Sequence, residues 1–235
     1  MKECFTIGGV SVTLNNGDAI DFIQTIDNET IDTIFFDAPF YQHTNSTDKI
    51  EGYKKWVQNM TGHFHRVLKE GGNVVYVNAP KYILATADIM LRHFEFRSQI
   101  PLLRRGALRP AWMLGFQHNI MLLLCKGDKK LKWFGSTKNH DKSFPTDVWD
   151  DIPYQNGFRA KYGWHPEAMN IEVVQRAVDL CSAPGDTILD PCMGAATTAI
   201  ACINHGVNFI GNEIRKDYYT LSKNRILERG CDLFI

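Results

Sequence analysis

The stretch that decides the fold is Ile188-Leu189-Asp190-Pro191-Cys192-Met193-Gly194-Ala195-Ala196-Thr197-Thr198-Ala199-Ile200. It begins with an apolar run that ends at Asp190, turns through a glycine, and continues as an apolar pattern of helical spacing. A glycine in such a loop lets the backbone come close to a ligand. Thr197 and Thr198 are predicted to cap the helix that follows. The stretch therefore predicts a strand, a tight ligand-binding loop and a helix.

A second informative segment lies far upstream, where Asp37-Ala38-Pro39-Phe40 closes the apolar run of residues 33–36. A carboxylate and a backbone carbonyl at the end of a strand provide two hydrogen-bond acceptors, one for each hydrogen of an amino group. An ordinary strand-ending turn explains the same residues, so the segment becomes informative only together with the rest of the chain.

Helical and extended patterns alternate along the chain, which predicts an α/β fold with a mostly parallel sheet covered on both faces. One extended segment, 119–125, follows its predecessor without a helix between them, and so predicts an antiparallel pair at one edge. Gly71-Gly72 is expected to end the helix before it. Strands are expected at 10–14, 33–36, 73–77, 96–103, 119–125, 187–190 and 209–214, and helices at 19–26, 53–68, 81–94, 172–181, 197–205 and 216–229.

Composition excludes some classes of protein and some kinds of site. Lysine plus arginine and aspartate plus glutamate are equal at 26 each, so any basic surface must be local. The six cysteines form no Cys-x-x-Cys pair, which favours buried, reduced thiols in a cytoplasmic protein over disulfides or zinc. His63 and His65 are expected on a helix surface and not as metal ligands. No signal peptide or membrane-spanning run is expected.

The two segments resemble the Asp-Pro-Pro-Tyr and Asp-Pro-Phe-x-Gly-x-Gly-Thr-Thr motifs of DNA adenine-N6 and cytosine-N4 amino-methyltransferases. Placing the catalytic motif first and the cofactor motif last is the circularly permuted order of the β group of that family. Other matches follow in family order: Gly17-Asp18, Tyr53-x-x-Trp56, Arg66-Val67-Leu68-Lys69-x-Gly71-Gly72, Asp147-Val148-Trp149, His165-Pro166 and Pro184-Gly185-Asp186.

The resemblance covers nearly the whole chain and implies a Rossmann-like, S-adenosylmethionine-dependent methyltransferase fold. It implies a single methyltransferase domain over residues 1–235, with a small target-recognition insertion around 126–164. Asp37 and the carbonyl of Ala38 would accept the amino hydrogens of the target base, Pro39 would stiffen the turn, and Phe40 would stack on the base. The family has proline at position 38 and tyrosine at position 40.

The resemblance also implies that S-adenosylmethionine is the cofactor and that no metal is needed. Glu213, at the end of the next strand, would accept the ribose hydroxyls, and Asp18 would meet the adenine amino group. Cys192 and Ala196 replace a phenylalanine and a glycine of the family, and the lysine that normally follows His165 is absent. The residues assigned to the cofactor are Asp18, His165, Asp190, Pro191, Cys192, Gly194, Ala196, Thr197, Thr198 and Glu213.

Double-stranded DNA is the expected partner, with RNA as a weaker alternative. Arg104, Arg105 and Arg109, in a loop between two strands, are expected to contact phosphates. A lysine-rich stretch that starts at Lys126 and includes Lys132 and Trp133 is a further candidate. The segment 41–52 is expected to form a lid over the base. A homodimer is compatible with the resemblance.

The function expected from these residues is methyl transfer from S-adenosylmethionine to the N6 amino group of adenine in DNA, in the cytoplasm of a bacterium or of a phage host. Aspartate and not serine at position 37 favours adenine over cytosine. The alternatives are cytosine-N4 methylation, RNA adenine methylation, and a catalytically degenerate DNA-binding subunit. The altered residues at positions 38, 192, 196, 169 and 170 favour the last of these, whereas the retained Asp37 and Glu213 argue against it.

Overall fold

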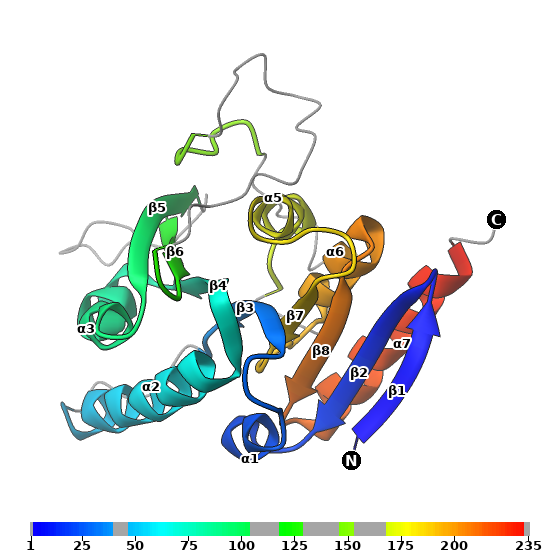
Figure 1. Ribbon diagram of the computed structural model, residues 1–235, viewed down its shortest axis with the longest axis horizontal. Helices are drawn as coiled ribbons and strands as arrows, with labels where there is room; N and C mark the ends of the chain where they lie inside the picture. The colour runs from blue at the N-terminus through cyan, green and yellow to red at the C-terminus, as the bar shows by residue number, and fades with distance from the viewer. Residues whose placement is uncertain (1, 40–46, 104–117, 129–145, 153–167, 233–235) are drawn as a thin grey trace, which may run out of the picture.

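The computed structural model describes residues 2–39, 47–103, 118–128, 146–152 and 168–232 (Figure 1). Seven of the residues predicted to form sites lie outside these ranges, and they keep the status of predictions. They are Phe40, Arg104, Arg105, Arg109, Lys132, Trp133 and His165.

Eight strands form one sheet in the order β1-β2-β8-β7-β3-β4-β6-β5. The five central strands, β2, β8, β7, β3 and β4, run parallel, as the alternation of helices and strands predicts. The strands are β1 (Lys2–Ile7), β2 (Val10–Asn16), β3 (Ile31–Asp37), β4 (Leu68–Asn78), β5 (Glu95–Leu103), β6 (His118–Cys125), β7 (Thr187–Asp190) and β8 (Asn208–Glu213).

Helices cover both faces of the sheet (Figure 1). One face carries α1 (Ala19–Gln24), α2 (Thr47–Val67) and α3 (Pro80–Leu91), and the other carries α5 (Ile171–Cys181), α6 (Thr197–His205) and α7 (Lys216–Asp232). The core is therefore divided by the sheet into two apolar layers.

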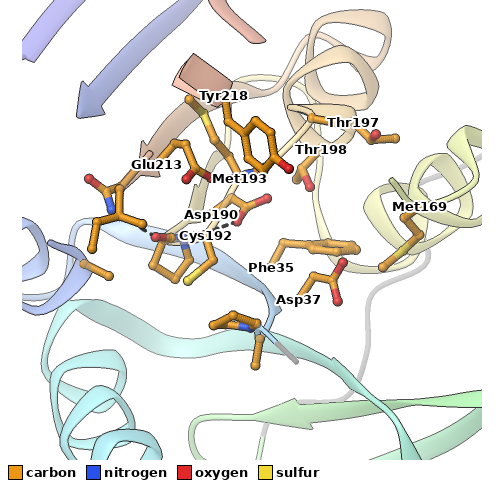
Figure 2. A pocket seen from close by; sticks show the side chains of 18 of the residues that line it. Phe35, Asp37, Met169, Asp190, Cys192, Met193, Thr197, Thr198, Glu213 and Tyr218 are labelled. Atoms are coloured by element: carbon orange, nitrogen blue, oxygen red, sulfur yellow. Dashed lines mark hydrogen bonds between the residues drawn. The ribbon is translucent and has the colours of Figure 1, made fainter. Parts of the chain in front are cut away.

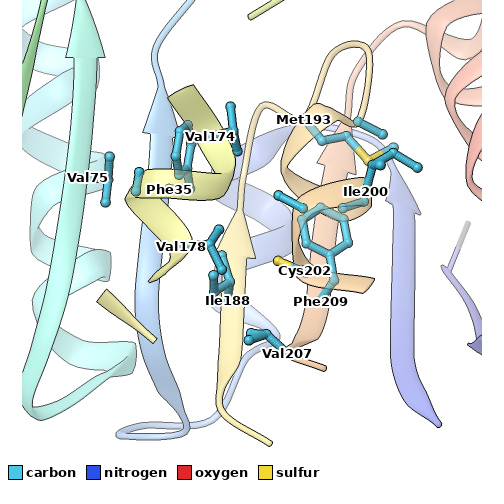
Figure 3. Packing of buried hydrophobic residues seen from close by; sticks show 14 of the residues in the cluster. Phe35, Val75, Val174, Val178, Ile188, Met193, Ile200, Cys202, Val207 and Phe209 are labelled. Atoms are coloured by element: carbon cyan, nitrogen blue, oxygen red, sulfur yellow. The ribbon is translucent and has the colours of Figure 1, made fainter. Parts of the chain in front are cut away.

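Alternation along β3 shows how the sequence fills both layers. Ile34 and Phe36 point toward α1–α3, whereas Phe35 points toward α5 and α6, because successive side chains of a strand face opposite sides of the sheet. Figure 3 shows the second layer, in which Phe35 lies beside Val174 of α5. A strand buried on both faces is apolar at nearly every position, as residues 33–36 are.

The predicted antiparallel edge pair is confirmed, since β5 pairs antiparallel with β6. The sheet also has a second antiparallel edge, because β1 pairs with β2 across the turn at Gly8 and Gly9. The sequence analysis did not predict β1. Its alternation of exposed and half-buried residues is typical of an edge strand that covers little apolar surface.

The end of α2 differs from the prediction. The helix begins at Thr47 and so includes part of the segment expected to form a lid, and it gives way to β4 directly at Leu68. Gly71 and Gly72 lie within β4 and do not cap the helix. Gly71 has φ 78°, and a Cβ on Gly72 would lie 2.8 Å from the carbonyl oxygen of Asp32, so the glycines accommodate a register shift against β3.

The topology brings the predicted site residues together at the carboxyl ends of the parallel strands, a side of the sheet that we call its carboxyl edge. The carboxyl ends of β3, β7 and β8 lie together at this edge, and β5 runs in the same direction as β4 because both pair antiparallel with β6. β5 therefore ends, at Leu103, on the same side of the sheet as Asp37. Cys125, the last residue of β6, ends at the opposite edge.

Two expected absences can be examined over the described ranges. None of the helices in this part of the chain is long and apolar enough to cross a membrane. No group of three or more histidine, cysteine, aspartate or glutamate side chains there is arranged to hold a metal ion.

Candidate active site

A cavity of about 590 Å³ opens at the carboxyl ends of β3, β7 and β8 (Figure 2). Its size lies in the ordinary range for small-molecule sites. Both segments singled out in the sequence meet in this cavity. The predicted site residues that line it are Asp18, Asp37, Ala38, Pro39, Asp190, Pro191, Cys192, Gly194, Thr197, Thr198 and Glu213.

The loop between β7 and α6 has the tight conformation that the sequence predicts. Gly194 has φ 46° and Ala196 has φ 57° and ψ 32°, so both lie in the left-handed region. Ala196 is completely buried and is the N-cap of α6, without a side-chain hydrogen bond. The prediction that Thr197 and Thr198 cap the helix is therefore wrong, because they are already its first residues. Ala196, which was predicted to bind the cofactor, does not line the cavity.

Glu213 fastens the loop to the end of β8. Its carboxylate accepts hydrogen bonds from the backbone N–H of Gly194, at 3.1 Å, and from that of Arg215, at 2.8 Å. The side chain is 7% exposed, and burial raises the pKa of Glu213, although these two backbone donors oppose the shift. The carboxylate still lines the cavity, and two carboxylate oxygens have lone pairs for further donors.

Asp190 lies deeper and is only 2% exposed. It accepts hydrogen bonds from the backbone N–H of Cys192, at 3.1 Å, and from the hydroxyl of Thr198. Burial raises the pKa of Asp190 to about 7, and the nearby charge of Glu213 adds to the shift. A buried carboxylate without a cation is costly, so its charge state depends on what enters the cavity.

Another part of the cavity wall is formed by the start of α1 and by Asn212. Asp18 caps α1 by accepting the N–H groups of Ile20, at 2.8 Å, and Asp21, at 3.3 Å. The amide of Asn212 donates to the carbonyl oxygens of Gly17 and Pro191, each at 3.1 Å. Asn212 therefore holds the Gly17-Asp18 turn against the Asp190-Pro191 turn.

The catalytic segment lies where β3 leaves the sheet. Asp37 is half-buried at the end of the strand, and Figure 2 shows its side chain in the same cavity as Asp190 and Thr198. Ala38 is 1% exposed, and its N–H donates to the carbonyl oxygen of Val77 at 3.3 Å. That bond extends the pairing of β3 with β4 by one residue and holds the start of the turn at Ala38.

Aromatic residues of α2 support this turn from one side. The rings of Tyr53 and Trp56 stack at 5.9 Å, and Trp56 lines the cavity beside Ala38 and Pro39. The hydroxyl of the buried Tyr53 accepts a 2.7 Å hydrogen bond from the amide of Asn78, at the end of β4. Burial raises the pKa of Tyr53, so its hydroxyl stays neutral.

Cys192 contributes a partly exposed thiol to the cavity. Burial and the surrounding carboxylates, Asp190, Glu213 and Asp37 among them, raise the pKa of Cys192 well above its usual range. The thiol is therefore protonated and a poor nucleophile.

Sequence reasoning missed several residues of the cavity wall. Met169 contributes from the residues just before α5, Val174 from α5 itself, and Tyr218 from α7. Met169 lies in the stretch where the family has a lysine that this chain lacks. The sequence analysis considered only the missing lysine and did not predict that a residue of this stretch lines the cavity. Tyr218 had no local signal, since one aromatic residue on a helix is as often a core residue as a ligand contact.

The cavity is rich in carboxylates. Among the described lining residues, four are acidic, Asp18, Asp37, Asp190 and Glu213, and one is basic, Arg215. The Arg215 guanidinium is exposed, pairs with Asp217 and lies 3.9 Å from the ring centroid of Tyr218. Such a cavity suits a ligand that carries positive charge together with hydroxyl or amino donors.

Lys126 was expected to begin a basic surface, but the structure buries it. It is 8% exposed, and its Nζ donates to the carbonyl oxygen of Leu68, at 2.9 Å, and pairs with Glu29, at 3.2 Å. It lies beyond Cys125, at the edge of the sheet opposite the cavity. Its role is structural.

A mostly parallel sheet with helices on both faces, a strand–loop–helix cavity at its carboxyl edge and an antiparallel strand β6 define a Rossmann-like methyltransferase fold. Known structures with this fold include M1.HpyAVI with S-adenosylmethionine (TM-score 0.71, 21% identity, 92% of this chain and 98% of that one). The protein TTHA0409 of Thermus thermophilus, complexed with S-adenosyl-L-methionine, gives a TM-score of 0.72 at 20% identity over 92% of this chain and 93% of that one. The cytosine-N4-specific PvuII DNA methyltransferase gives 0.75 at 14% identity over 94% and 91%.

The chain belongs to the N6/N4 DNA methylase family, whose model matches residues 31–224. It is 26% identical over 249 residues to the DNA adenine methyltransferase YhdJ of Escherichia coli K12, covering 93% of this chain and 84% of that protein. It is 27% identical over 231 residues to the type II methyltransferase M.BamHI of Bacillus amyloliquefaciens, covering 86% of this chain and 54% of that protein.

Proposed function

We propose that this protein transfers a methyl group from S-adenosylmethionine to the N6 amino group of adenine in DNA. The observation that carries the proposal is the meeting of two distant segments in one cavity. The Asp37-Ala38-Pro39 strand end and the loop from Asp190 to Thr198 face each other across about 590 Å³. Family membership gives the reaction class, and the geometry supports the roles proposed for individual residues.

The residues of the cavity fit S-adenosylmethionine. Glu213 offers a buried carboxylate at the strand end where ribose hydroxyls bind in Rossmann-type folds. The left-handed turn at Gly194 brings backbone, and no side chain, to the cavity wall. When bound, this cofactor supplies an electrophilic methyl group on a positively charged sulfur. The acidic lining of the cavity stabilises such a cation by Coulomb attraction.

Asp37 and Ala38 activate the amino group that is to be methylated. The lone pair of an exocyclic amino group is delocalised into the base, which makes the nitrogen a weak nucleophile. A carboxylate and a carbonyl that each accept one amino hydrogen localise that lone pair on nitrogen. The pairing of Ala38 with Val77 holds the strand end in place before the base arrives, so little reorganisation is required.

Adenine is proposed over cytosine because Asp37, and not serine, occupies the first position of the motif. The relative named an adenine methyltransferase, YhdJ, supports the same choice. Both bases present the same amino chemistry to Asp37 and Ala38, so the product must be identified directly.

The test is to incubate the purified protein with unmethylated bacterial DNA and isotope-labelled S-adenosylmethionine, and to identify labelled nucleosides by mass spectrometry. We expect N6-methyldeoxyadenosine at a defined sequence. Labelled N4-methyldeoxycytidine would replace the proposal with cytosine methylation. Cofactor binding without any labelled nucleoside, on DNA or on RNA, would support the degenerate binding subunit.

Asp37→Ala is the matching variant. Its loss of a charged acceptor should lower the rate of methyl transfer by a factor of about 100 or more. Cofactor affinity, measured by calorimetry, should change by no more than a few-fold, because other residues hold the cofactor. Near-normal turnover by the variant would contradict the role proposed for Asp37.

A further inference from the structure

Two side chains of helix α7 that the sequence analysis assigned to no site contact the loop between β7 and α6, residues 191–196, which we call the cofactor loop. The hydroxyl of Ser222 donates to the carbonyl oxygen of Gly194, and the guanidinium of Arg225 donates to that of Ala195. The same guanidinium lies 3.3 Å from the hydroxyl of Thr197. Ser222 is completely buried and Arg225 is half-buried, so these bonds are partly shielded from water.

These contacts flank Ala196, which with Glu29 is one of the two described residues other than glycine that have a positive φ. Ala196, with φ 57°, has a conformation that costs an L-residue roughly 1–2 kcal/mol and costs glycine almost nothing. Its neighbours on both sides, Ala195 and Thr197, are the two residues that Arg225 binds. The strained residue is thus enclosed by a single side chain from another element.

The other side of the loop is held by β8. Glu213 accepts the N–H of Gly194, and the carbonyl oxygen of Asn212 accepts the N–H of Met193 at 2.9 Å. These two bonds fix the start of the loop. They do not reach Ala195 or Ala196. The N–H of Ala196 donates to the carbonyl oxygen of Met193 at 2.7 Å, which closes the turn from within the loop, and the side-chain contacts to Ala195 and Thr197 come from α7.

We infer that Ser222 and Arg225 are positioning residues that hold the cofactor loop in its binding conformation, and that Arg225 replaces the conformational freedom of a glycine at position 196. The inference rests on the proposed function in so far as the loop binds S-adenosylmethionine. Neither side chain lines the cavity, so both act through the loop.

The first test uses the ligand-free protein. Arg225→Met keeps the length and the apolar stem of the side chain but removes its donors. We expect amide hydrogen exchange at Ala195, Ala196 and Thr197 to become faster in this variant, because the loop leaves its left-handed turn more often. Lys223→Met is the control, since it removes an ion pair between α7 and Glu3 of β1 without touching the loop.

The second test measures cofactor affinity by calorimetry. Arg225→Met should weaken S-adenosylmethionine binding about tenfold, since a charged donor to a carbonyl is lost. Ser222→Ala should act in the same direction with a smaller effect. The double variant Arg225→Met with Ala196→Gly should recover at least about threefold, because glycine accepts the left-handed turn without support. Ala195→Gly in place of Ala196→Gly should recover nothing.

If glycine restores cofactor affinity at position 196 and not at position 195, Arg225 acts by positioning the loop. A residue that only stabilised the fold as a whole would not show this difference. Unchanged affinity in Arg225→Met, or lost affinity that Ala196→Gly fails to restore, would overturn the inference. Wild-type protein that binds no cofactor would count against the proposed function, while the hydrogen-exchange comparison would still decide whether Arg225 holds the loop.

Discussion

Asp190 shows how one buried carboxylate links ligand binding to pH. In the unfolded chain it titrates near its usual pKa of 3.8, whereas burial raises the pKa to about 7 in the folded protein. Between these values the folded protein holds the proton more tightly than the unfolded chain. Stability therefore falls as pH rises from about 4 to about 7, by about 1.4 kcal/mol for each unit by which the pKa is raised.

Asp190→Asn should remove this dependence, because the amide cannot ionise but keeps an oxygen for the Cys192 N–H. Urea unfolding of ligand-free protein at about pH 5 and about pH 8 should show the variant gaining stability relative to wild type at the higher pH. Affinity for a cationic cofactor should change in the opposite sense in wild type, rising with pH. Parallel stability curves for the two proteins would show that Asp190 is ionised throughout.

Single residues also show what could be read from the sequence. Asp37, Asp190, Gly194 and Glu213 were identified because each ends a strand or opens a loop, and those positions converge in any parallel sheet. Arg225 could not be identified, because its function depends on the direction in which α7 packs. Ala196 was interpreted as a loss of glycine, whereas the chain keeps the glycine conformation and supports it from outside.

At the scale of single elements, Gly211 of β8 packs so closely against Phe209 and against Met193 of the cofactor loop that no side chain fits at position 211. A Cβ on Gly211 would lie 2.5 Å from Cε1 of Phe209 and 2.7 Å from Sδ of Met193. Both neighbours are buried, so neither can move aside freely. Gly211 is thus required by the contact between a central strand and the loop, and not by backbone conformation, since its φ is not positive.

Gly211→Ala should lower the free energy of unfolding by about 1–3 kcal/mol and weaken cofactor binding, because Met193 belongs to the loop. The control is Gly62→Ala in the exposed middle of α2, where no atom lies within 4 Å of the added Cβ. That change should raise stability by about 0.5–1 kcal/mol through helix propensity. Thermal unfolding and calorimetry of both variants measure the difference, and equal effects would contradict the packing argument.

The element boundaries that sequence reasoning missed have local causes. The α2–β4 junction was misjudged because a helix followed immediately by a strand leaves no turn for Gly71 and Gly72 to mark. The edge strand β1 was missed because its weak alternation reflects the little surface that it buries. By contrast α6, at Thr197–His205, matches its predicted range, since a left-handed turn precedes it and Gly206 ends it with φ 70°.

At the scale of the molecule, the part of the predicted 126–164 insertion that is described packs on the core. Trp149 is 5% exposed, its Nε1 donates to the carbonyl oxygen of Thr146, and the guanidinium of Arg176 lies 5.3 Å from its ring. Arg176 also donates two hydrogen bonds to Asp151. The sequence could not predict this docking onto α5, because it joins residues that no local pattern connects.

The sheet topology also distinguishes the two basic segments proposed for DNA binding. The segment with Arg104, Arg105 and Arg109 begins where β5 ends, at the same edge of the sheet as Asp37 and the cavity. The stretch with Lys132 begins after Cys125, at the opposite edge, beside the buried Lys126. We therefore expect a base that reaches Asp37 to bring its flanking phosphates toward the strand end that precedes Arg104.

Replacing Arg104, Arg105 and Arg109 together with alanine should lower DNA affinity and flatten its salt dependence. The slope of log affinity against log salt concentration should fall by about one unit for each lost phosphate contact. Cofactor affinity should not change, because other residues, Glu213 and Gly194 among them, are proposed to hold the cofactor. A single arginine that reads guanine would instead relax the methylated sequence with little change in slope.

The matched control is the triple alanine variant of Lys129, Lys130 and Lys132, which removes the same charge from the segment that leaves the far edge of the sheet. Binding of both variants and wild type to one duplex is measured across a salt titration. A flattened slope in the arginine variant alone places DNA at the carboxyl edge, over the cavity. The reverse pattern would mean that the lysine stretch folds back from the far edge to reach the duplex, and the assignment of DNA contacts would move to Lys132 and Trp133.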